Sequence, residues 1–138
     1  MTSTTQPGGI PALKTIAMPR DANANGDIFG GWLLAQMDLA GAVIAHERCR
    51  GRTATVAVEA MSFIAPVKIG DTVSCFAELV GTGRSSMRVR IQTFVRRQSN
   101  QEVVRVTEGL FTYVAIDEEG RSRPLPPETE IPALTAPQ

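Results

Sequence analysis

The sequence predicts an α+β fold in which one long helix packs against a curved antiparallel sheet of about five strands. Residues 29–45 carry only two polar side chains, Gln36 and Asp38, so a helix here must be buried on most sides. Residues 87–95 instead alternate apolar and polar side chains, which is typical of a strand with one wet face. A single helix among several long strands favours a sheet that wraps around the helix.

The helix and the strand before it follow from local signals. A short strand near residues 13–18 precedes a loop, residues 19–27, that is dense in Asn, Asp and Gly. The helix is expected over residues 28–48. Asp27 is expected as its N-cap, and Gly51 lies just past its end, where helix stop signals are found.

Four further strands are expected at residues 52–65, 72–80, 85–97 and 102–117. Strands this long, joined by short turns, imply a strongly curved antiparallel sheet. The edges of such a sheet and one face of the helix would remain uncovered. A dimer is therefore favoured over a monomer.

The length of 138 residues fits a single domain. Residues 1–9 are rich in Ser, Thr and Gly and are expected to be disordered, residues 10–123 to form the domain, and residues 124–138 to be a proline-rich tail. The 14 basic and 14 acidic side chains balance, which argues against a nucleic-acid partner. No apolar run approaches a membrane span and no signal peptide is visible, so we expect a cytoplasmic protein without a membrane partner.

No metal site or resident cofactor is expected. The two cysteines, Cys49 and Cys75, are isolated from each other and from His46, the single histidine. His46 lies near the expected end of the helix, where a surface or capping role suits it. No GxSxG elbow accompanies it, so a Ser–His–Asp triad is not supported.

Asp38 is the strongest candidate for chemistry. Its neighbours three and four positions away on a helix are Leu34, Ala35, Gly41 and Ala42, so no basic partner is available within the helix. Burying an unpaired carboxylate is costly, and such groups cluster at functional sites. The alternative is that Asp38 faces solvent at a gap in the sheet or caps a backbone amide of another segment.

The loop that enters the helix, residues 21–31, is a second candidate. A helix N-terminus presents free N–H groups and a partial positive charge, and Gly30 and Gly31 would let a ligand approach them. Asn23 and Asn25 offer amide donors to a carbonyl oxygen. The alternative is an Asx-rich turn at a tight helix entry, although two glycines in a first helical turn are destabilising.

The segment GTGRSS, residues 81–86, lies between two expected strands and favours a hairpin turn. Arg84, Ser85 and Ser86 can nevertheless hold a phosphate from such a turn. Pattern alone leaves both interpretations open.

Four segments carry a family resemblance: AMPRDANANGDIFGGWLLAQMDLAGAVIA, VEAMSFIAPVKIGD, VGTGRSSM and TEGLFTYVAID. They resemble the hot-dog-fold acyl-CoA thioesterases of the YciA type, relatives of the cytosolic long-chain acyl-CoA hydrolases. The similarity runs from about residue 13 to residue 126. It implies the hot-dog fold, a long helix wrapped by an antiparallel sheet, which agrees with the pattern above.

The resemblance also implies an active site at a subunit interface, where Asp38 of one chain meets Asn23 of another. It implies hexamers assembled from dimers, with coenzyme A in a groove between subunits and with Arg84, Ser85 and Ser86 near its phosphates. Coenzyme A enters only as part of the substrate and product, so no cofactor is implied.

The implied reaction is hydrolysis of acyl-CoA to a free fatty acid and coenzyme A. A thiol has a pKa near ~8.5, so the thiolate leaves without a general acid. Asp38 would act as general base or as nucleophile, and an N–H of Gly30 or Gly31, together with Asn23, would polarise the thioester carbonyl.

Two alternatives remain. One is a non-catalytic acyl-CoA-binding or sensing protein of the same fold, which would keep the groove without needing Asp38. The other is a hot-dog dehydratase or hydratase, but His46 lies outside the region where such a reaction needs a histidine. Acyl preference depends on residues such as Trp32, Met37, Met61 and Phe63, which either line the acyl tunnel or pack the core.

Overall fold

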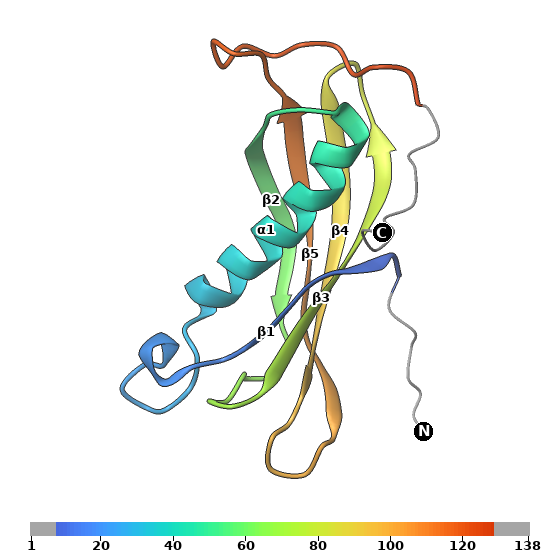
Figure 1. The fold of residues 1–138 in the computed structure, drawn as a ribbon. Coiled ribbons are helices and arrows are strands. Elements are labelled where there is room, and N and C mark those ends of the chain that lie inside the picture. Colours follow the sequence, from blue (N-terminus) through green and yellow to red (C-terminus); the bar gives the residue numbers. More distant parts are fainter. Residues whose placement is uncertain (1–7, 129–138) are drawn as a thin grey trace, which may run out of the picture.

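The computed structural model describes residues 8–128, in which one helix lies diagonally across one face of a five-stranded antiparallel sheet (Figure 1). The strand order is β1-β3-β4-β5-β2. The predicted fold class is confirmed, and most of the predicted boundaries lie within three residues of those observed. The elements are β1 (Ile10–Ile16), the short 3-10 helix η1 (Pro19–Asp21), α1 (Gly30–Cys49), β2 (Thr53–Phe63), β3 (Thr72–Thr82), β4 (Ser86–Arg96) and β5 (Val103–Ala115).

Strand β4 shows how the alternating pattern builds the core. Its inward residues are fully or almost fully buried under α1, and they are Met87, Val89, Ile91, Thr93 and Val95. Arg88, Arg90 and Arg96 are exposed on the outer face, as predicted. Gln92 departs from the pattern because its side chain is only 7% exposed. It accepts a hydrogen bond from the Gly8 N–H and donates one to Glu108.

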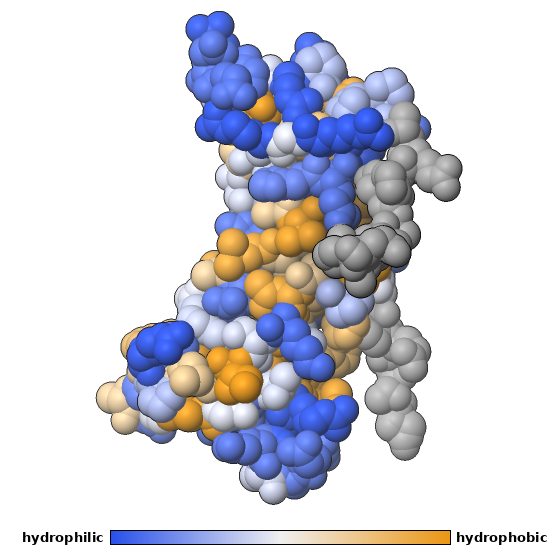
Figure 2. Space-filling view, viewed as in Figure 1, coloured by the Kyte–Doolittle hydropathy of each residue, from blue (hydrophilic) through white to orange (hydrophobic). Residues whose placement is uncertain are grey.

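Helix α1 buries only one of its faces in a single chain. The buried residues are Leu33, Met37, Ala40, Gly41, Ala45 and Cys49. Ala35, Leu39 and Val43 form a stripe on the opposite face, with Leu39 57% exposed and Val43 40% exposed. Figure 2 shows apolar side chains gathered over the middle of the molecule, where α1 crosses it. The expectation of burial on most sides is therefore not met within one chain.

The predicted N-cap of the helix is wrong. Phe29 holds the N-cap position, with no side-chain hydrogen bond to the helix. The Asp27 carboxylate instead pairs with the Lys68 ammonium, which fastens the loop before α1 to the connection between β2 and β3. The neighbouring Ile28 N–H donates to the Val67 carbonyl at 3.0 Å.

Arg50 and Arg123 cap the C-terminal end of α1. Arg50 takes the left-handed conformation (φ 56°), and its N–H donates to the His46 carbonyl at 2.7 Å. Gly51 lies just past this cap, as predicted. A Cβ at Gly51 would lie 2.7 Å from the Arg123 guanidinium, which donates to the Cys49 carbonyl at 2.9 Å. The glycine therefore makes room for a side chain that satisfies the helix end.

The described part of the proline-rich segment, residues 124–128, packs on the domain. The Leu125 N–H donates to the Arg84 carbonyl, and the Arg48 guanidinium donates to the Pro126 carbonyl, both at 2.8 Å. Residues 1–7 of the expected disordered start and residues 129–138 of the expected tail lie outside the described residues.

A buried ion pair fixes the connection between β2 and β3. Asp71 is 2% exposed, and its carboxylate accepts hydrogen bonds from the Arg97 guanidinium at 2.7 Å and from the N–H groups of Lys68 and Gln98. Arg97 also donates to the Pro66 carbonyl at 2.8 Å. Because each oxygen of the carboxylate has a donor, the buried charge is compensated.

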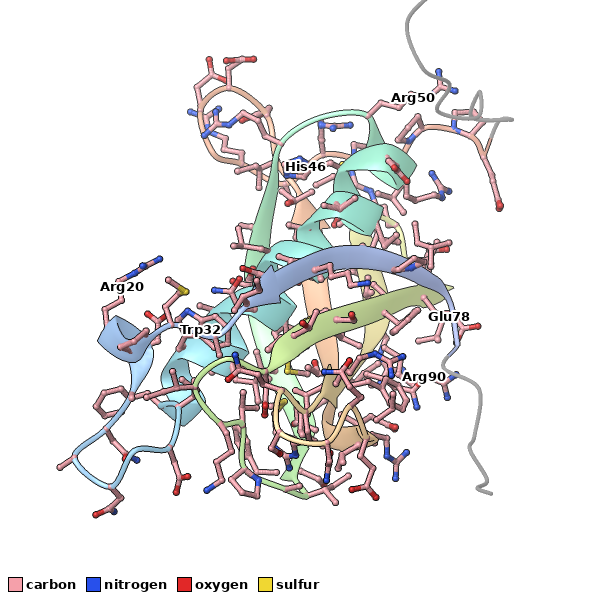
Figure 3. All side chains as sticks on the ribbon, turned by 60° about the horizontal axis from the view of Figure 1, so that its bottom comes forward. Arg20, Trp32, His46, Arg50, Glu78 and Arg90 are labelled. Carbon is pink, nitrogen blue, oxygen red and sulfur yellow. The ribbon has the colours of Figure 1, made fainter. Side chains whose placement is uncertain are left out.

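Arg97→Met should destabilise the fold by about 3 kcal/mol, because it leaves the Asp71 charge buried without a cation. Arg90→Met is the matched control. It breaks the pair that Arg90 forms with Glu78 (Figure 3). The two side chains are 44% and 38% exposed, so the loss should cost less than about 1 kcal/mol. Urea unfolding at one fixed protein concentration measures both. Equal losses in the two variants would contradict the role given to Asp71.

Candidate active site

Asp38 lies two turns into α1 with a half-buried carboxylate. Its Oδ1 accepts a hydrogen bond from the Thr55 hydroxyl of β2 at 2.7 Å. No ion pair within residues 8–128 involves Asp38. Within the described residues the carboxylate also caps no backbone amide.

Tyr113 of β5 holds the backbone of α1 at the same residue. Its fully buried side chain donates a hydrogen bond from the hydroxyl to the Asp38 main-chain carbonyl at 2.8 Å. A Cβ at Gly41 would lie 2.2 Å from that hydroxyl oxygen, so glycine is needed for this approach. Burial raises the pKa of Tyr113, and the negative charge and hydrogen bonding of Asp38 raise this pKa further.

The loop before α1 fixes the orientation of the Asn23 amide. Asn23 Oδ1 accepts hydrogen bonds from the N–H groups of Asn25 at 2.9 Å and Asp27 at 3.2 Å. The oxygen is thus turned into the loop, and the amide nitrogen Nδ2 has no acceptor within the described chain. The Asx turn, which the sequence left open as the alternative, is present, and the turn itself does not use the amide donor.

The first turn of α1 presents accessible backbone N–H groups. Gly30 and Gly31 are exposed, and within residues 8–128 nothing accepts a hydrogen bond from either N–H. A Cβ at Gly31 would meet no atom within 4 Å, and one at Gly30 would meet only the Phe63 ring, at 3.6 Å. A carbonyl oxygen can therefore approach this end of the helix.

One chain does not bring these groups together. At about 1.5 Å of rise per residue, Asp38 lies about 12 Å along the helix axis from Gly30. A reacting carbonyl must lie about 3 Å from both its attacking group and its hydrogen-bond donors. The Asp38 carboxylate and the Gly30 N–H of the same chain are too far apart for that.

An apolar groove opens beside the helix N-terminus. Its volume is about 290 Å³, and its lining residues are Ile28, Gly30, Leu33, Phe63, Ile64, Ala65, Pro66 and Val67. Phe63 is 58% exposed. Two of the residues expected either to line the acyl tunnel or to pack the core lie in different places. Phe63 lines this groove, whereas Met37 is fully buried in the core.

The segment GTGRSS forms the turn between β3 and β4, as the pattern favoured. The Gly83 N–H donates to the Ser86 carbonyl at 2.9 Å, and the Ala115 N–H donates to the Ser85 carbonyl at 2.9 Å. The side chain of Arg84 is exposed, and those of Ser85 and Ser86 are half-buried. These three residues are available to a ligand at the end of the molecule opposite the Asn23 loop (Figure 1).

His46 is exposed near the C-terminal end of α1, at the other end of the helix from Trp32 (Figure 3). Its predicted surface position is confirmed. Within residues 8–128 no three His, Cys, Asp or Glu side chains form a group able to hold a metal ion. No helix in that part of the chain is long and apolar enough to cross a membrane.

The fold agrees with comparisons to known proteins. Residues 25–102 match the model of the thioesterase superfamily. The acyl-CoA thioester hydrolase YciA of Escherichia coli K12 is 48% identical over 125 residues, which cover 88% of this chain and 95% of that protein. The chain therefore belongs to the thioesterase superfamily.

Thioesterases of known structure are also similar to this chain. A hexameric thioesterase from Yersinia pestis is 49% identical, with a TM-score of 0.84 over 88% of this chain and 98% of that one. A hexameric broad specificity acyl-coenzyme A thioesterase is 46% identical, with a TM-score of 0.84 over 88% of this chain and 84% of that one. The expected hot-dog fold is confirmed by a hexameric hotdog fold thioesterase of Campylobacter jejuni, which is 40% identical, with a TM-score of 0.82 over 86% of this chain and 91% of that one.

Sequence reasoning missed Thr55 and Tyr113, whose side chains are the two that hydrogen-bond to Asp38 within the described residues. Thr55 is 17 residues from Asp38 along the chain, and Tyr113 is 75 residues away. Such contacts depend on strand order, which local patterns do not report. A signal for Tyr113 did exist, because it is the one tyrosine of the chain and falls in an apolar strand, where a hydroxyl needs an acceptor.

The single tyrosine makes a phenolate titration specific to Tyr113. The raised pKa in the folded state means that the stability from this group is fully present below the unfolded pKa, about 10, and is lost as the pH rises above it. We expect no phenolate absorbance from the folded protein at about pH 10. It should appear only together with unfolding, followed by circular dichroism. Phenolate absorbance from the folded protein at that pH would contradict this assignment.

Proposed function

We propose that the protein hydrolyses acyl-CoA to a free fatty acid and coenzyme A, in an active site shared by two copies of the chain. The observation that carries the proposal is the Asp38 carboxylate, which is half-buried and lacks a cationic partner among residues 8–128. It occurs in a member of the thioesterase superfamily whose relatives are named acyl-CoA thioester hydrolases.

The chemistry requires an attack on the thioester carbonyl and stabilisation of the charge on its oxygen. Asp38 Oδ2, which has no hydrogen-bond partner within the described chain, either takes a proton from the attacking water or attacks the carbonyl carbon to give an anhydride that water opens. In both routes the C–S bond breaks and the thiolate of coenzyme A leaves without a general acid, because the pKa of a thiol is about 8.5. The other product is the fatty acid.

The oxyanion donors are the N–H groups of Gly30 and Gly31 and the Nδ2 of Asn23. All three lack an acceptor among residues 8–128, which suits donors held ready for a developing charge. The two glycines lie too far along α1 from Asp38 of the same chain, so these donors act on the carbonyl attacked by Asp38 of a second copy.

The assembly is a dimer that builds a hexamer. The apolar stripe of Ala35, Leu39 and Val43 on α1 needs a cover, and β2 is an edge strand with Val56 56% exposed and Val58 42% exposed. The related thioesterases of known structure are hexameric. Both features support contact between copies of the chain.

The ligand has a charged end and an apolar end. We assign its phosphates to Arg84, Ser85 and Ser86 at the turn between β3 and β4, where a guanidinium and hydroxyl groups are accessible. The acyl chain is assigned to the apolar groove beside Gly30, because none of the eight lining residues is polar. This lining favours aliphatic acyl groups over charged ones.

The first test is release of the thiol of coenzyme A from a series of acyl-CoA substrates. Asp38→Asn keeps the size of the side chain but removes its basic oxygen, so kcat should fall by about a thousandfold or more. Glu47→Gln is the matched control, since it neutralises an exposed acid on the same helix and should leave kcat unchanged.

Three outcomes of this assay separate the functions. Turnover by the parent and by Glu47→Gln, with loss in Asp38→Asn, supports the proposal. If Asp38→Asn still releases thiol at the parent rate, Asp38 does not have the proposed catalytic role. A parent protein that binds acyl-CoA but never releases thiol is a non-catalytic acyl-CoA sensor, the alternative that the same groove allows.

Phe63→Ala tests the acyl groove. Loss of the ring widens the groove, so the ratio of kcat/KM for long over short acyl chains should rise by about tenfold. Val103→Ala is the control, because it truncates another exposed apolar side chain, 50% exposed, that does not line the groove. The assignment fails if the chain-length profile of Phe63→Ala matches that of the parent.

A further inference from the structure

The turn that carries Asn23 is closed by two hydrogen bonds to Asp27. The Asn23 N–H donates to the Asp27 carbonyl at 2.7 Å, and the Asp27 N–H donates to Asn23 Oδ1 at 3.2 Å. The second bond holds the oxygen of the side-chain amide, so it also sets where the amide nitrogen Nδ2 points. The orientation of this donor therefore depends on the position of the Asp27 backbone.

Lys68 holds Asp27 from the connection between β2 and β3. Its ammonium pairs with the Asp27 carboxylate, and the same two residues form an isolated antiparallel bridge. At the next residue of the loop, the Ile28 N–H donates to the Val67 carbonyl at 3.0 Å. The loop is thus fastened at this point by both backbone and side-chain contacts.

Lys68 is in turn fixed to a buried ion pair. Its N–H donates to Asp71 Oδ2 at 2.9 Å, and the same oxygen accepts a hydrogen bond from the Arg97 guanidinium at 2.7 Å. Asp71 is 2% exposed, so its position is set by the core. An unbroken series of contacts therefore leads from the core through Lys68 and Asp27 to the Asn23 amide.

The ion pair between Lys68 and Asp27 contributes little to the stability of the whole fold. The two side chains are 54% and 35% exposed, and ion pairs this accessible to water are weak. A weak pair still changes the populations of a surface loop, because loops open locally at a much lower free energy than the whole fold unfolds. Its effect is therefore expected on the loop and on the donor that the loop carries.

We propose that Lys68 is a positioning residue for the reaction: its ammonium holds Asp27 in place, and Asp27 in turn holds the Asn23 amide with Nδ2 directed at the substrate carbonyl. A donor held in this way needs no reorganisation when charge develops on the carbonyl oxygen. The inference rests on the proposed thioesterase activity, in which Asn23 is an oxyanion donor, and adds to it a residue outside α1 and its entry loop.

Kinetics of Lys68→Met and Lys68→Arg test this role. Methionine keeps an unbranched side chain without the charge, and kcat should fall about three- to fivefold, the range that an exposed ion pair can supply. KM should stay within about twofold, because the donor acts on the transition state. Arginine restores the charge and should restore kcat to within about 1.5-fold of the parent.

Two further comparisons separate positioning from a merely structural effect. In about 1 M NaCl, which screens exposed charges, the kcat of the parent should approach that of Lys68→Met. Asn23→Ala alone should lower kcat about a hundredfold, and in its background Lys68→Met should lower kcat no further, because the donor through which Lys68 acts is gone. A difference that salt leaves unchanged, or that is undiminished without Asn23, overturns the proposal.

Lys14→Met is the matched control. It makes the same change at the other lysine of the chain, an exposed residue of β1 that forms no ion pair within residues 8–128. Thermal unfolding of every variant checks the fold, and Lys68→Gln replaces Lys68→Met if the methionine chain is misfolded. The proposal also fails if Lys68→Met keeps the parent kcat, if Lys14→Met loses as much, or if Lys68→Arg is as slow as Lys68→Met. A parent without thiol release would instead refute the thioesterase activity itself.

Discussion

The close approach of α1 to the inner face of the sheet sets the position of Asp38, the strongest candidate for chemistry. At Gly41 the helix backbone comes so near that an added Cβ would lie 2.2 Å from the Tyr113 hydroxyl and 2.8 Å from Ile91. This contact fixes how far α1 lies from β4 and β5, and how it is rotated about its axis. The rotation directs Asp38 toward β2, where Thr55 meets it. A larger residue at position 41 would therefore disturb the site through the fold.

The same helix supports the proposal that the active site needs two copies of the chain. One face of the helix packs into the core. Leu39 and Val43 on the opposite face remain exposed, so one chain buries only part of the apolar surface of the helix. Its N-terminus carries the free N–H groups, whereas the carboxylate lies about 12 Å farther along. Two antiparallel copies of such a helix would place the carboxylate of one near the N-terminus of the other. In the proposed function, one second copy would both cover the apolar stripe and complete the site.

The sequence alone predicted the fold because the fold depends on local patterns, and the same patterns singled out Asp38 as a candidate for chemistry. The alternation in β4 and the apolar run of α1 survive in the structure, since burial against one layer requires that periodicity. Asp27 was assigned wrongly because Lys68, distant in sequence, competes for its carboxylate. The burial of Gln92 depends on Gly8 and Glu108, and the contacts of Asp38 depend on β2 and β5. Long-range partners of this kind become visible only when the strand order is known.

The chain order of the elements has a consequence for how the protein folds. Strands β3, β4 and β5 form a meander of sequential neighbours, whereas β1 and β2 lie at opposite edges and are separated along the chain by α1. The entropy of loop closure therefore favours the meander as the first part to form, with α1 docking on it afterwards. During synthesis, however, α1 emerges before any of these three strands. The apolar helix is therefore synthesised before the strands that bury it, and its apolar surface stays exposed until they follow.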